Sequence, residues 1–411
     1  MRALCMLFPA FLFLIFVFDS SFASGPIHGS KGAAMGTAFS AIADDPSAIV
    51  SNPAGLIQLE GTNIYGGNSF VIPSTTFKGA SGQEEETDFQ IFFPPHAYVS
   101  SDFAGRDLRL GLGIYSLFGI GGRKWDRDGS LRYLSIKNQI ATVNINPTVA
   151  YRVLPSLSAG FGVDLMYSRN EATRKVNQSL FGALDGDTNL KMDGWGLGVN
   201  AGILFTPDEK LSFGLAYRSR IKIRHKGRMD LNNIAVALQP SFGGSRFKTD
   251  VTNTMTFPDI FTLGAAYRPS KALTVTVEAE KMRWSSFRKA GIALDREVLE
   301  AGLTDISNDL GWKDIWILKA GAECKVNDKL ALRGGYSYVG TPVPEKTLEP
   351  GNPDSRQHNI SLGFGYKFDK IVIDFFYMAG FYANRKVGNA ILSGSYDNFV
   401  HTTGISVGYR F

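Results

Sequence analysis

Two alternations, one within segments and one between them, constrain the fold of this chain most. From about residue 61 onward apolar side chains alternate with polar or small ones, which is the two-residue period of a β-strand. In residues 359–368, for example, Ile360, Leu362 and Phe364 are each followed by a polar or small residue. A soluble sandwich would alternate in the same way, so the period alone predicts only an all-β chain.

The lengths of the connections between the segments distinguish a membrane barrel from a soluble sandwich. The predicted strands are residues 61–72, 89–101, 107–118, 139–153, 156–170, 191–206, 210–226, 250–268, 272–286, 313–325, 329–339, 356–367, 370–382 and 399–411. Short turns at every second connection are Leu154-Pro155, Pro207-Asp208-Glu209, Pro269-Ser270-Lys271, Asn327-Asp328 and Asp369. Long connections between them include 119–138, 171–190, 227–249 and 287–312. All tight turns therefore lie at one end, as in bacterial outer-membrane barrels, whose short turns are periplasmic.

Closure into a barrel is what the membrane requires of such a sheet. An open edge in hydrocarbon would leave a row of backbone groups without partners. We therefore predict a transmembrane antiparallel β-barrel of about fourteen strands over residues 61–411, with Arg218, Glu278, Glu280 and Asp374 facing inward. A barrel of this size encloses more space than its own side chains fill, so the lumen needs a water channel or a plug.

Aromatic–charged pairs mark the ends of several predicted strands on the short-turn side. These pairs are Tyr151-Arg152, Tyr267-Arg268, Tyr366-Lys367 and Tyr409-Arg410. An aromatic ring beside a charge is typical of a membrane–water interface. Tyr217-Arg218 falls inside a predicted strand, and chance is the alternative explanation for the pattern, since both residue types are common in this chain.

The first residues resemble a secretory signal peptide. Arg2 precedes an apolar stretch from Leu4 to Phe18, and Ser21-Phe22-Ala23 places small residues where signal peptidase cleaves. An N-terminal membrane anchor is the alternative, but it needs about 20 apolar residues. Residues 1–23 are predicted to be removed, which leaves Cys324 as the one cysteine of the mature chain and allows no disulfide within it.

Residues 24–60 lack the strand period and are rich in Gly, Ala and Ser. Asp45 followed by Pro46 is a favourable helix start, because the carboxylate can cap the helix and proline suits its first position. The residue before Pro53 avoids the α region, so this helix should end by Ser51 or Asn52. A disordered leader is the alternative, but the apolar residues here favour a segment packed inside the lumen as a plug.

The same segment resembles a known family. The run from Gly36 to Leu56, with Asp44-Asp45 and Asn52-Pro53-Ala54, is similar to the N-terminal hatch of the FadL/TodX family of outer-membrane transporters for long-chain fatty acids and aromatic hydrocarbons. Further matches are Phe257-Pro258-Asp259, Trp284-Ser285-Ser286-Phe287, Trp312-Lys313-Asp314, Arg333-Gly334-Gly335-Tyr336 and Gly408-Tyr409-Arg410-Phe411. The resemblance covers essentially the whole mature chain.

The resemblance implies a fourteen-stranded barrel in which a hatch blocks the lumen. Outer loops would capture hydrophobic substrate, and movement of the hatch would release it sideways at a kinked third strand. The hatch motif would be Asp44, Asp45, Asn52, Pro53 and Ala54. Glycine marks bends in strands, so the kink is expected among Gly111, Gly113, Gly119, Gly121 and Gly122. Long-chain fatty acids are the expected substrate, with aromatic hydrocarbons as the alternative.

The long connection before the tenth predicted strand is the candidate outer capture groove. Apolar residues at helical spacing in 292–306 predict an amphipathic helix there, with Leu294, Leu299, Leu303 and Ile306 on its apolar face. This face could line the groove, or it could pack on a neighbouring loop.

Other chemistry motifs are weak in this chain. Gly404-Ile405-Ser406-Val407-Gly408 spells the hydrolase pattern G-x-S-x-G, but it lies in the last predicted strand rather than at a strand-to-helix turn. An outer-membrane lipase would also need a Ser/His pair facing lipid. His28, His96, His225, His358 and His401 show no two-ligand spacing, so no metal or organic cofactor is expected and no enzymatic activity is predicted.

Composition and charge limit the partners. The net charge is +5 and no long basic run is present, which argues against nucleic-acid binding. The expected location is the bacterial outer membrane, in contact with lipid and lipopolysaccharide, as a monomer assembled by the barrel-assembly machinery through the C-terminal Phe411. An open diffusion porin remains a further alternative, although a plug of about thirty-five residues would obstruct it.

Overall fold

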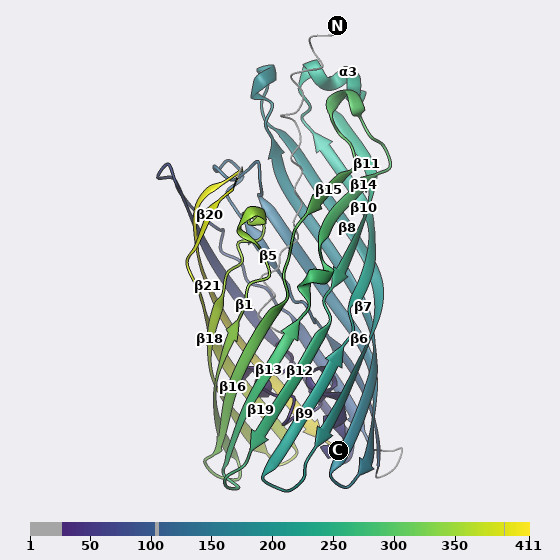
Figure 1. Cartoon of the computed structure of the whole chain (residues 1–411), viewed down its shortest axis with the longest axis vertical. Coiled ribbons are helices and arrows are strands. Elements are labelled where there is room, and N and C mark those ends of the chain that lie inside the picture. Colours follow the sequence, from purple (N-terminus) through teal and green to yellow (C-terminus); the bar gives the residue numbers. More distant parts are fainter. Residues whose placement is uncertain (1–26, 103–106, 390) are drawn as a thin grey trace.

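Fourteen wall strands form a closed antiparallel barrel in the computed structural model, which describes residues 27–102, 107–389 and 391–411 (Figure 1). The barrel closes where the first strand, β1, pairs with the last, β21, from Asn63↔Arg410 to Gly79↔Gly394. Nine wall strands are continuous: β1 (Asn63–Gly79), β3 (Pro95–Ser101), β6 (Lys137–Leu154), β7 (Leu157–Val176), β8 (Gly186–Phe205), β17 (Leu330–Val339), β18 (Gln357–Phe368), β19 (Ile371–Tyr382) and β21 (Ser393–Arg410). The predicted strand number is confirmed.

The other five wall strands are interrupted near mid-height. They are β4 (Leu108–Tyr115) with β5 (Ile120–Lys124), β9 (Leu211–Arg218) with β10 (Ile221–Asn232), β11 (Arg246–Phe257) with β12 (Ile260–Tyr267), β13 (Leu273–Met282) with β14 (Lys289–Leu294), and β15 (Ile306–Asp309) with β16 (Ile315–Lys325). Two short strands, β2 (Glu84–Glu86) and β20 (Arg385–Gly388), lie among the long loops. Two predicted strands, 210–226 and 250–268, run across such a break, because two missing residues barely disturb the two-residue period. The predicted strands 107–118, 272–286 and 313–325 end or begin at the break, so β5, β14 and β15 lie in segments that were predicted as long loops.

The two faces of the wall differ as a membrane barrel requires. Leu197 on β8 is 65% exposed and Leu362 on β18 is 63% exposed, and both point outward. Arg218, Glu278, Glu280 and Asp374 are buried in the lumen, as predicted. Because lipid accepts only apolar side chains, this distribution identifies the outer face as the lipid-contacting one.

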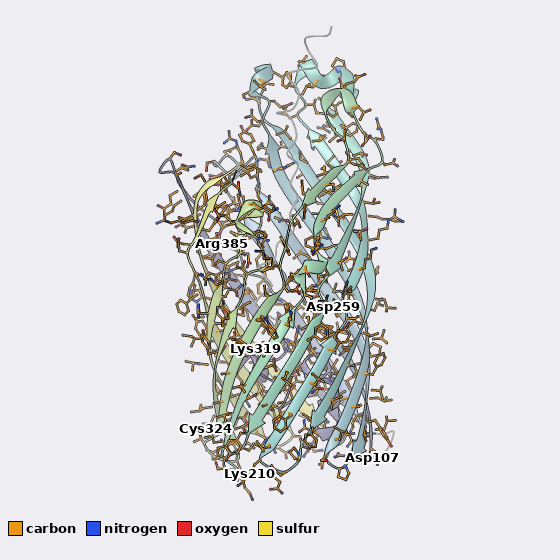
Figure 2. All side chains as sticks on the ribbon, in the orientation of Figure 1. Asp107, Lys210, Asp259, Lys319, Cys324 and Arg385 are labelled. Carbon is orange, nitrogen blue, oxygen red and sulfur yellow. The ribbon has the colours of Figure 1, made fainter. Side chains whose placement is uncertain are left out.

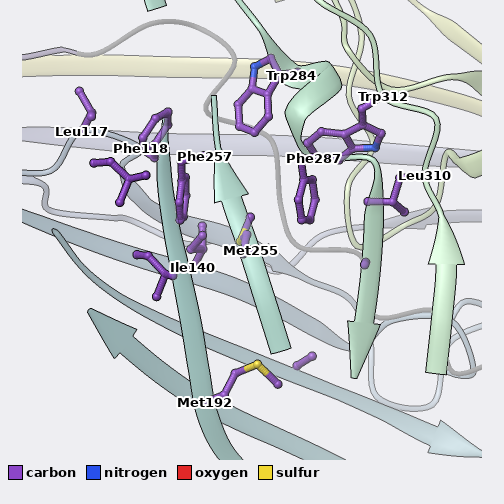
Figure 3. Packing of buried hydrophobic residues seen from close by; sticks show 14 of the residues in the cluster. Leu117, Phe118, Ile140, Met192, Met255, Phe257, Trp284, Phe287, Leu310 and Trp312 are labelled. Carbon is purple, nitrogen blue, oxygen red and sulfur yellow. The ribbon is translucent and has the colours of Figure 1, made fainter. Parts of the chain in front are cut away.

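The strand interruptions bring large side chains inward at one level (Figure 3). Phe118 follows the end of β4 and packs on Phe257 with 4.7 Å between ring centroids. Trp284 and Phe287 contact Trp312 from the breaks in the neighbouring strands, with centroid distances of 5.3 and 4.9 Å. An aromatic layer therefore lies in the lumen between the long loops and the lower half of the barrel.

Short helical turns lie in the long loops. They are η3 (Ser179–Phe181), η4 (Val236–Leu238), α3 (Gln239–Phe242), η6 (Leu299–Ala301) and η7 (Glu345–Thr347). A further turn, η5 (Trp284–Ser286), lies in the interruption between β13 and β14. The amphipathic helix predicted over 292–306 is wrong. Residues 289–294 instead extend the wall as β14, pairing with β11 through Val251↔Leu294, and return as β15. Backbone partners offered by the extended β11 outweigh the local helical spacing.

The N-terminal segment, residues 27–59, lies inside the barrel near the short-turn end, where Figure 1 shows it in purple. It contains α1 (Ser30–Ala34), α2 (Ala48–Ser51) and η2 (Pro53–Gln58). Helix α1 contacts β17, β18, β19 and β21, whereas η2 contacts the opposite wall at β4, β6, β7 and β8. The predicted signal peptide lies outside the described residues. Within those residues, no helix is long and apolar enough to cross a membrane.

Candidate functional site

Asn52 holds the N-terminal segment to itself and to the wall. Its side chain is fully buried, and Nδ2 donates to the carbonyl of Ser40 at 2.9 Å and to that of Ile203 on β8 at 3.0 Å. Oδ1 accepts from the backbone N–H of Ala54 at 3.2 Å and so caps η2, which begins at Pro53. The predicted motif residues Asn52, Pro53 and Ala54 thus form one cap against the wall.

A belt of inward-facing glycines lets this segment approach the wall. At Gly202 on β8 an added Cβ would overlap with the side chain of Asn52, and at Gly335 on β17 it would overlap with the backbone of Gly36. Other glycines of the belt, each with the N-terminal segment at the place of its missing Cβ, are Gly111, Gly160, Gly214, Gly264, Gly321 and Gly363. Because the belt runs around most of the barrel, the segment is fitted to the wall by backbone as well as by side chains.

The two aspartates of the motif have different surroundings. Asp44 accepts from Lys31 Nζ at 2.8 Å, while Asp45 Oδ1 accepts from the backbone N–H of Ser47 at 2.8 Å and from its hydroxyl. The predicted helix ends at Ser51 as expected but begins only at Ala48, because Asp45 makes its turn with Ser47 before the helix starts. Burial raises the pKa of Asp45 to about 6. Partial burial also raises that of Asp44, but the Lys31 ammonium outweighs it and holds this pKa below its usual value.

A charged network ties the segment to the wall at the short-turn end. Lys31 lies 3.9 Å from Glu323, which accepts from Arg333 at 2.7 Å. Arg333 also donates to Asp374 at 2.6 Å, and the Tyr65 hydroxyl donates to the same carboxylate at 3.1 Å. Each of these buried charges has a partner of opposite sign, which is the condition under which burial of an ion is tolerated.

On the opposite side of the lumen the wall donates to carbonyls of the segment. Arg218 donates to Val50 O at 3.1 Å and is also paired with Asp164, and Asn200 donates to Ile49 O at 2.8 Å.

Lys319, near mid-height in Figure 2, lies 2.8 Å from both Glu278 and Glu280. Glu278 in turn accepts from the backbone N–H groups of Phe39 and Ser40, at 3.2 and 2.8 Å.

A first cavity of about 680 Å³ lies directly against the charged side chains of Arg218, Glu278, Glu280 and Lys319. It is lined by His28, Phe39, Val50, Pro53, Arg218 and Lys319, among others. His28 packs edge-on against Tyr115 with 5.1 Å between ring centroids. The cavity therefore combines small apolar surfaces of the N-terminal segment with fixed charges of the wall.

The G-x-S-x-G serine takes part in anchoring. Ser406 Oγ lies 2.8 Å from Ser30 Oγ and accepts from the Ser30 backbone N–H at 3.0 Å, and His96 Nε2 is also 2.8 Å away. This Ser–His pair faces the lumen rather than lipid, and Ser406 is fully buried. The other His96 nitrogen has no hydrogen-bond partner in the described part of the chain, so no carboxylate orients the imidazole as a catalytic base requires.

The five candidate kink glycines divide into two groups. Gly111 and Gly113 lie within β4, where added Cβ atoms would meet Ile49 at 3.0 and 3.1 Å, so their place is explained by the N-terminal segment. Gly119 lies in the interruption between β4 and β5 with φ of 79°, and Gly121 and Gly122 follow Ile120 within β5. The third wall strand is thus interrupted over residues 116–119.

A second cavity of about 800 Å³ borders this interruption. It is lined by Ile27 of the N-terminal segment, by residues 116–117 and 119–123, and by side chains of β1, β18, β19 and β21. Apolar lining side chains include Val71, Phe92, Ile120, Met378 and Val400. Sequence reasoning missed this cavity and the glycine belt, because both arise from strands that are distant in the chain.

The four candidate groove residues do not share one exposed face. Leu294 and Leu303 are buried in the main apolar cluster and Ile306 packs partly against it, while Leu299 is 70% exposed. Their role in substrate capture stays a prediction.

Comparisons with known proteins agree with this architecture. The model of the family described as outer membrane protein transport protein (OMPP1/FadL/TodX) matches residues 23–411. The long-chain fatty acid transport protein of Escherichia coli O6:H1 is 25% identical over 369 residues, which cover 82% of this chain and 81% of that protein. Outer membrane protein P1 of Haemophilus influenzae is 25% identical over 307 residues, covering 67% of this chain and 63% of the relative.

Solved structures share the fold at lower identity. A FadL homologue of Pseudomonas aeruginosa has a TM-score of 0.83 at 18% identity and covers 94% of this chain and 99% of its own. The toluene transporter TodX of P. putida has a TM-score of 0.77 at 18% identity, covering 93% and 98%. Members of the matched family are transport channels rather than enzymes. The chain belongs to the OMPP1/FadL/TodX family and is a transport protein of the outer membrane.

Proposed function

We propose that this protein takes up long-chain fatty acids, that its N-terminal segment moves as a hatch, and that substrate leaves sideways between β4 and β5. One observation carries the proposal: the second cavity touches both Ile27 of the segment and the interruption at residues 116–119. An apolar chain in this cavity would therefore lie against the part that moves and against the part of the wall that opens.

The wall is weakly paired beside that interruption. β3 pairs with β4 from Ala97 to Ser101, whereas β5 pairs with β6. On its other edge β5 accepts the bond from Asp88 N–H to Lys124 O. A gap between residues 93–97 and 115–122 can open at little cost in backbone hydrogen bonds, and the apolar side chains around it suit an alkyl chain better than water.

The preference for fatty acids over aromatic hydrocarbons rests on the curated relatives, one of which is a long-chain fatty acid transport protein at 25% identity. The resemblance to the toluene transporter is one of fold. Uptake of labelled oleate by cells lacking their own transporter tests this, with toluene as the competitor. Uptake of toluene without uptake of oleate would contradict the proposal.

Hatch movement can be tested with a reversible tether. The hydroxyl oxygens of Ser30 and Ser406 lie 2.8 Å apart, so cysteines at these two positions should form a disulfide between the segment and β21. With Cys324→Ser as background, we expect oxidised Ser30→Cys/Ser406→Cys protein to lose most oleate uptake and to regain it on reduction. Ser30→Cys alone is the matched control.

Full uptake by the oxidised double variant would show that α1 need not leave the wall. A water-filled porin would give swelling of liposomes in small sugars with the wild-type protein. Because the segment fills the lumen, we expect swelling only after deletion of residues 25–56, together with loss of selective oleate uptake.

The remaining partners are proposals as well. Phe411 follows the end of β21 and is 64% exposed, so it is accessible to the barrel-assembly machinery. In the described residues β1 pairs with β21 along its whole length, so the two terminal strands close the barrel without a second copy. We propose a monomer surrounded by lipid and lipopolysaccharide.

A further inference from the structure

Arg123 is a buried cation with neutral partners. It lies on β5, is 3% exposed and donates from Nε to Thr75 Oγ1 at 2.8 Å and from Nη1 to Gly122 O at 3.1 Å. Within residues 27–102, 107–389 and 391–411 no carboxylate forms an ion pair with it, whereas the buried Arg218 and Arg333 are both paired in this way. A buried charge without a counter-charge is costly, so the site favours an anion from outside the chain.

Gln357 is an independent observation in the same cavity. It begins β18 and is fully buried, and in the described structure neither its amide nitrogen nor its amide oxygen has a hydrogen-bond partner. Buried amides are normally satisfied, and one that is not points to a missing partner. Both Gln357 and Arg123 line the second cavity.

The rest of that cavity suits a long hydrocarbon chain. It encloses about 800 Å³, which includes space open to solvent. Val71, Phe92, Met378 and Val400 contribute apolar surface. A ligand that fits one guanidinium, one free amide and an apolar remainder is an amphiphile with a single carboxylate.

We propose that Arg123 binds the carboxylate of the fatty acid, with Gln357 as a further polar contact, while the alkyl chain occupies the cavity beside the interruption at residues 116–119. This assignment rests on the proposed function and names the groups that would distinguish a fatty acid from a neutral hydrocarbon. The carboxylate supplies the counter-charge that the described residues do not.

The test compares an acid with its neutral counterpart. Full-length protein in lipid nanodiscs is titrated with oleic acid and with oleyl alcohol, and protein-free nanodiscs correct for partition into lipid. A hydrogen bond to a charged group contributes about 1.5–3 kcal/mol, so Arg123→Gln should weaken binding of oleate about 10- to 100-fold. Binding of oleyl alcohol should change less than about threefold, because it makes no ion pair.

Arg132→Gln is the matched control, because Arg132 pairs with Asp185 in the outer loops and does not line the cavity. It should leave both affinities unchanged. Gln357→Leu, which keeps the bond between Arg123 and Thr75, should weaken binding of oleate about 3- to 10-fold and spare the alcohol. It provides the answer should Arg123→Gln fail to fold, as shown by loss of heat-modifiable migration on gels.

The possible outcomes separate the two proposals. Equal weakening of acid and alcohol by Arg123→Gln would mean that Arg123 only supports the wall, and unchanged binding of oleate by both variants would overturn the site. If the wild-type protein binds neither oleate nor oleyl alcohol but takes up toluene, the proposed function itself fails. Wild-type binding of oleate with unaltered variants would leave the function intact and remove only this assignment.

Discussion

Asn52 joins three pieces of chain at one point, so its substitution should disturb the N-terminal segment at several contacts at once. Replacement by alanine would leave the carbonyls of Ser40 and Ile203 without a donor and η2 without its cap. A buried group that loses its partner costs about 1–3 kcal/mol. We expect Asn52→Ala to loosen residues 40–58 without unfolding the barrel.

Hydrogen exchange of those residues, compared with exchange in the wall strands, is the measurement for Asn52→Ala. Asn63→Ala is the control, since its side chain donates to Glu60 O in a solvent-exposed bond. Unchanged protection of residues 40–58 would show that the cap contributes little to docking.

The neighbouring aspartates predict opposite pH dependences. Because the pKa of Asp45 is raised to about 6 by burial, docking of the segment should weaken as pH rises from about 4 to about 6 and stay constant above, by up to about 3 kcal/mol. The pKa of Asp44 is lowered because Lys31 outweighs partial burial. Its contribution to docking is therefore present near neutral pH and lost as pH falls below about 4.

Conductance in planar bilayers measures this docking as leak. We expect Asp45→Asn to abolish the increase in leak between pH 4 and 6, and Asp44→Asn to raise leak at pH 7, where the pair with Lys31 is otherwise intact. Leak of Asp45→Asn protein that still rises between pH 4 and 6 would assign the dependence to another group.

Among the elements, β17 offers two adjacent glycines with opposite surroundings. A Cβ at Gly335 would overlap with the backbone of Gly36, whereas one at Gly334 would find its nearest neighbour, Leu362 Cδ2, at 3.7 Å. Overpacking typically costs about 1–3 kcal/mol. Gly335→Ala should therefore displace the N-terminal segment and increase leak, while Gly334→Ala should behave like the wild type.

Thermal unfolding and leak of the two β17 variants measure this difference. Both substitutions add the same methyl group to the same strand, so each variant serves as the control for the other. Equal behaviour of the two would mean that the glycine belt does not govern the fit of the segment.

The elements also show where sequence reasoning stops. The two-residue period predicted at least part of every wall strand, because inward and outward environments alternate along each one, but β5, β14 and β15 fall in segments predicted as loops. The period did not predict the interruptions at Ser219-Arg220 or Pro258-Asp259. The first of these interruptions explains why Tyr217-Arg218 falls inside a predicted strand: the pair ends β9. Proline at 258 has no N–H for the ladder, which was the available signal for that break.

At the scale of the whole molecule, long-range pairing limited the prediction. The hatch motif was found because its residues are contiguous, from Asp44 to Ala54. The second cavity was not, because Arg123 and Gln357 are 234 positions apart and meet only once the barrel closes. The alternating connections fixed strand number and orientation, but no local pattern tells which inward-facing polar residues lie at the same height.

The contact between Ser30 and Ser406 joins the N-terminal segment to β21, the last strand of the wall, beside the β1–β21 seam. Synthesis and export deliver the segment first and β21 last, so the earliest residues must be kept without their final partner until the rest of the chain has arrived. A closed wall would leave the segment no route inward from the side. We therefore expect enclosure of the segment and completion of the seam to be linked steps late in assembly, both of which a chain truncated before β21 would fail to complete.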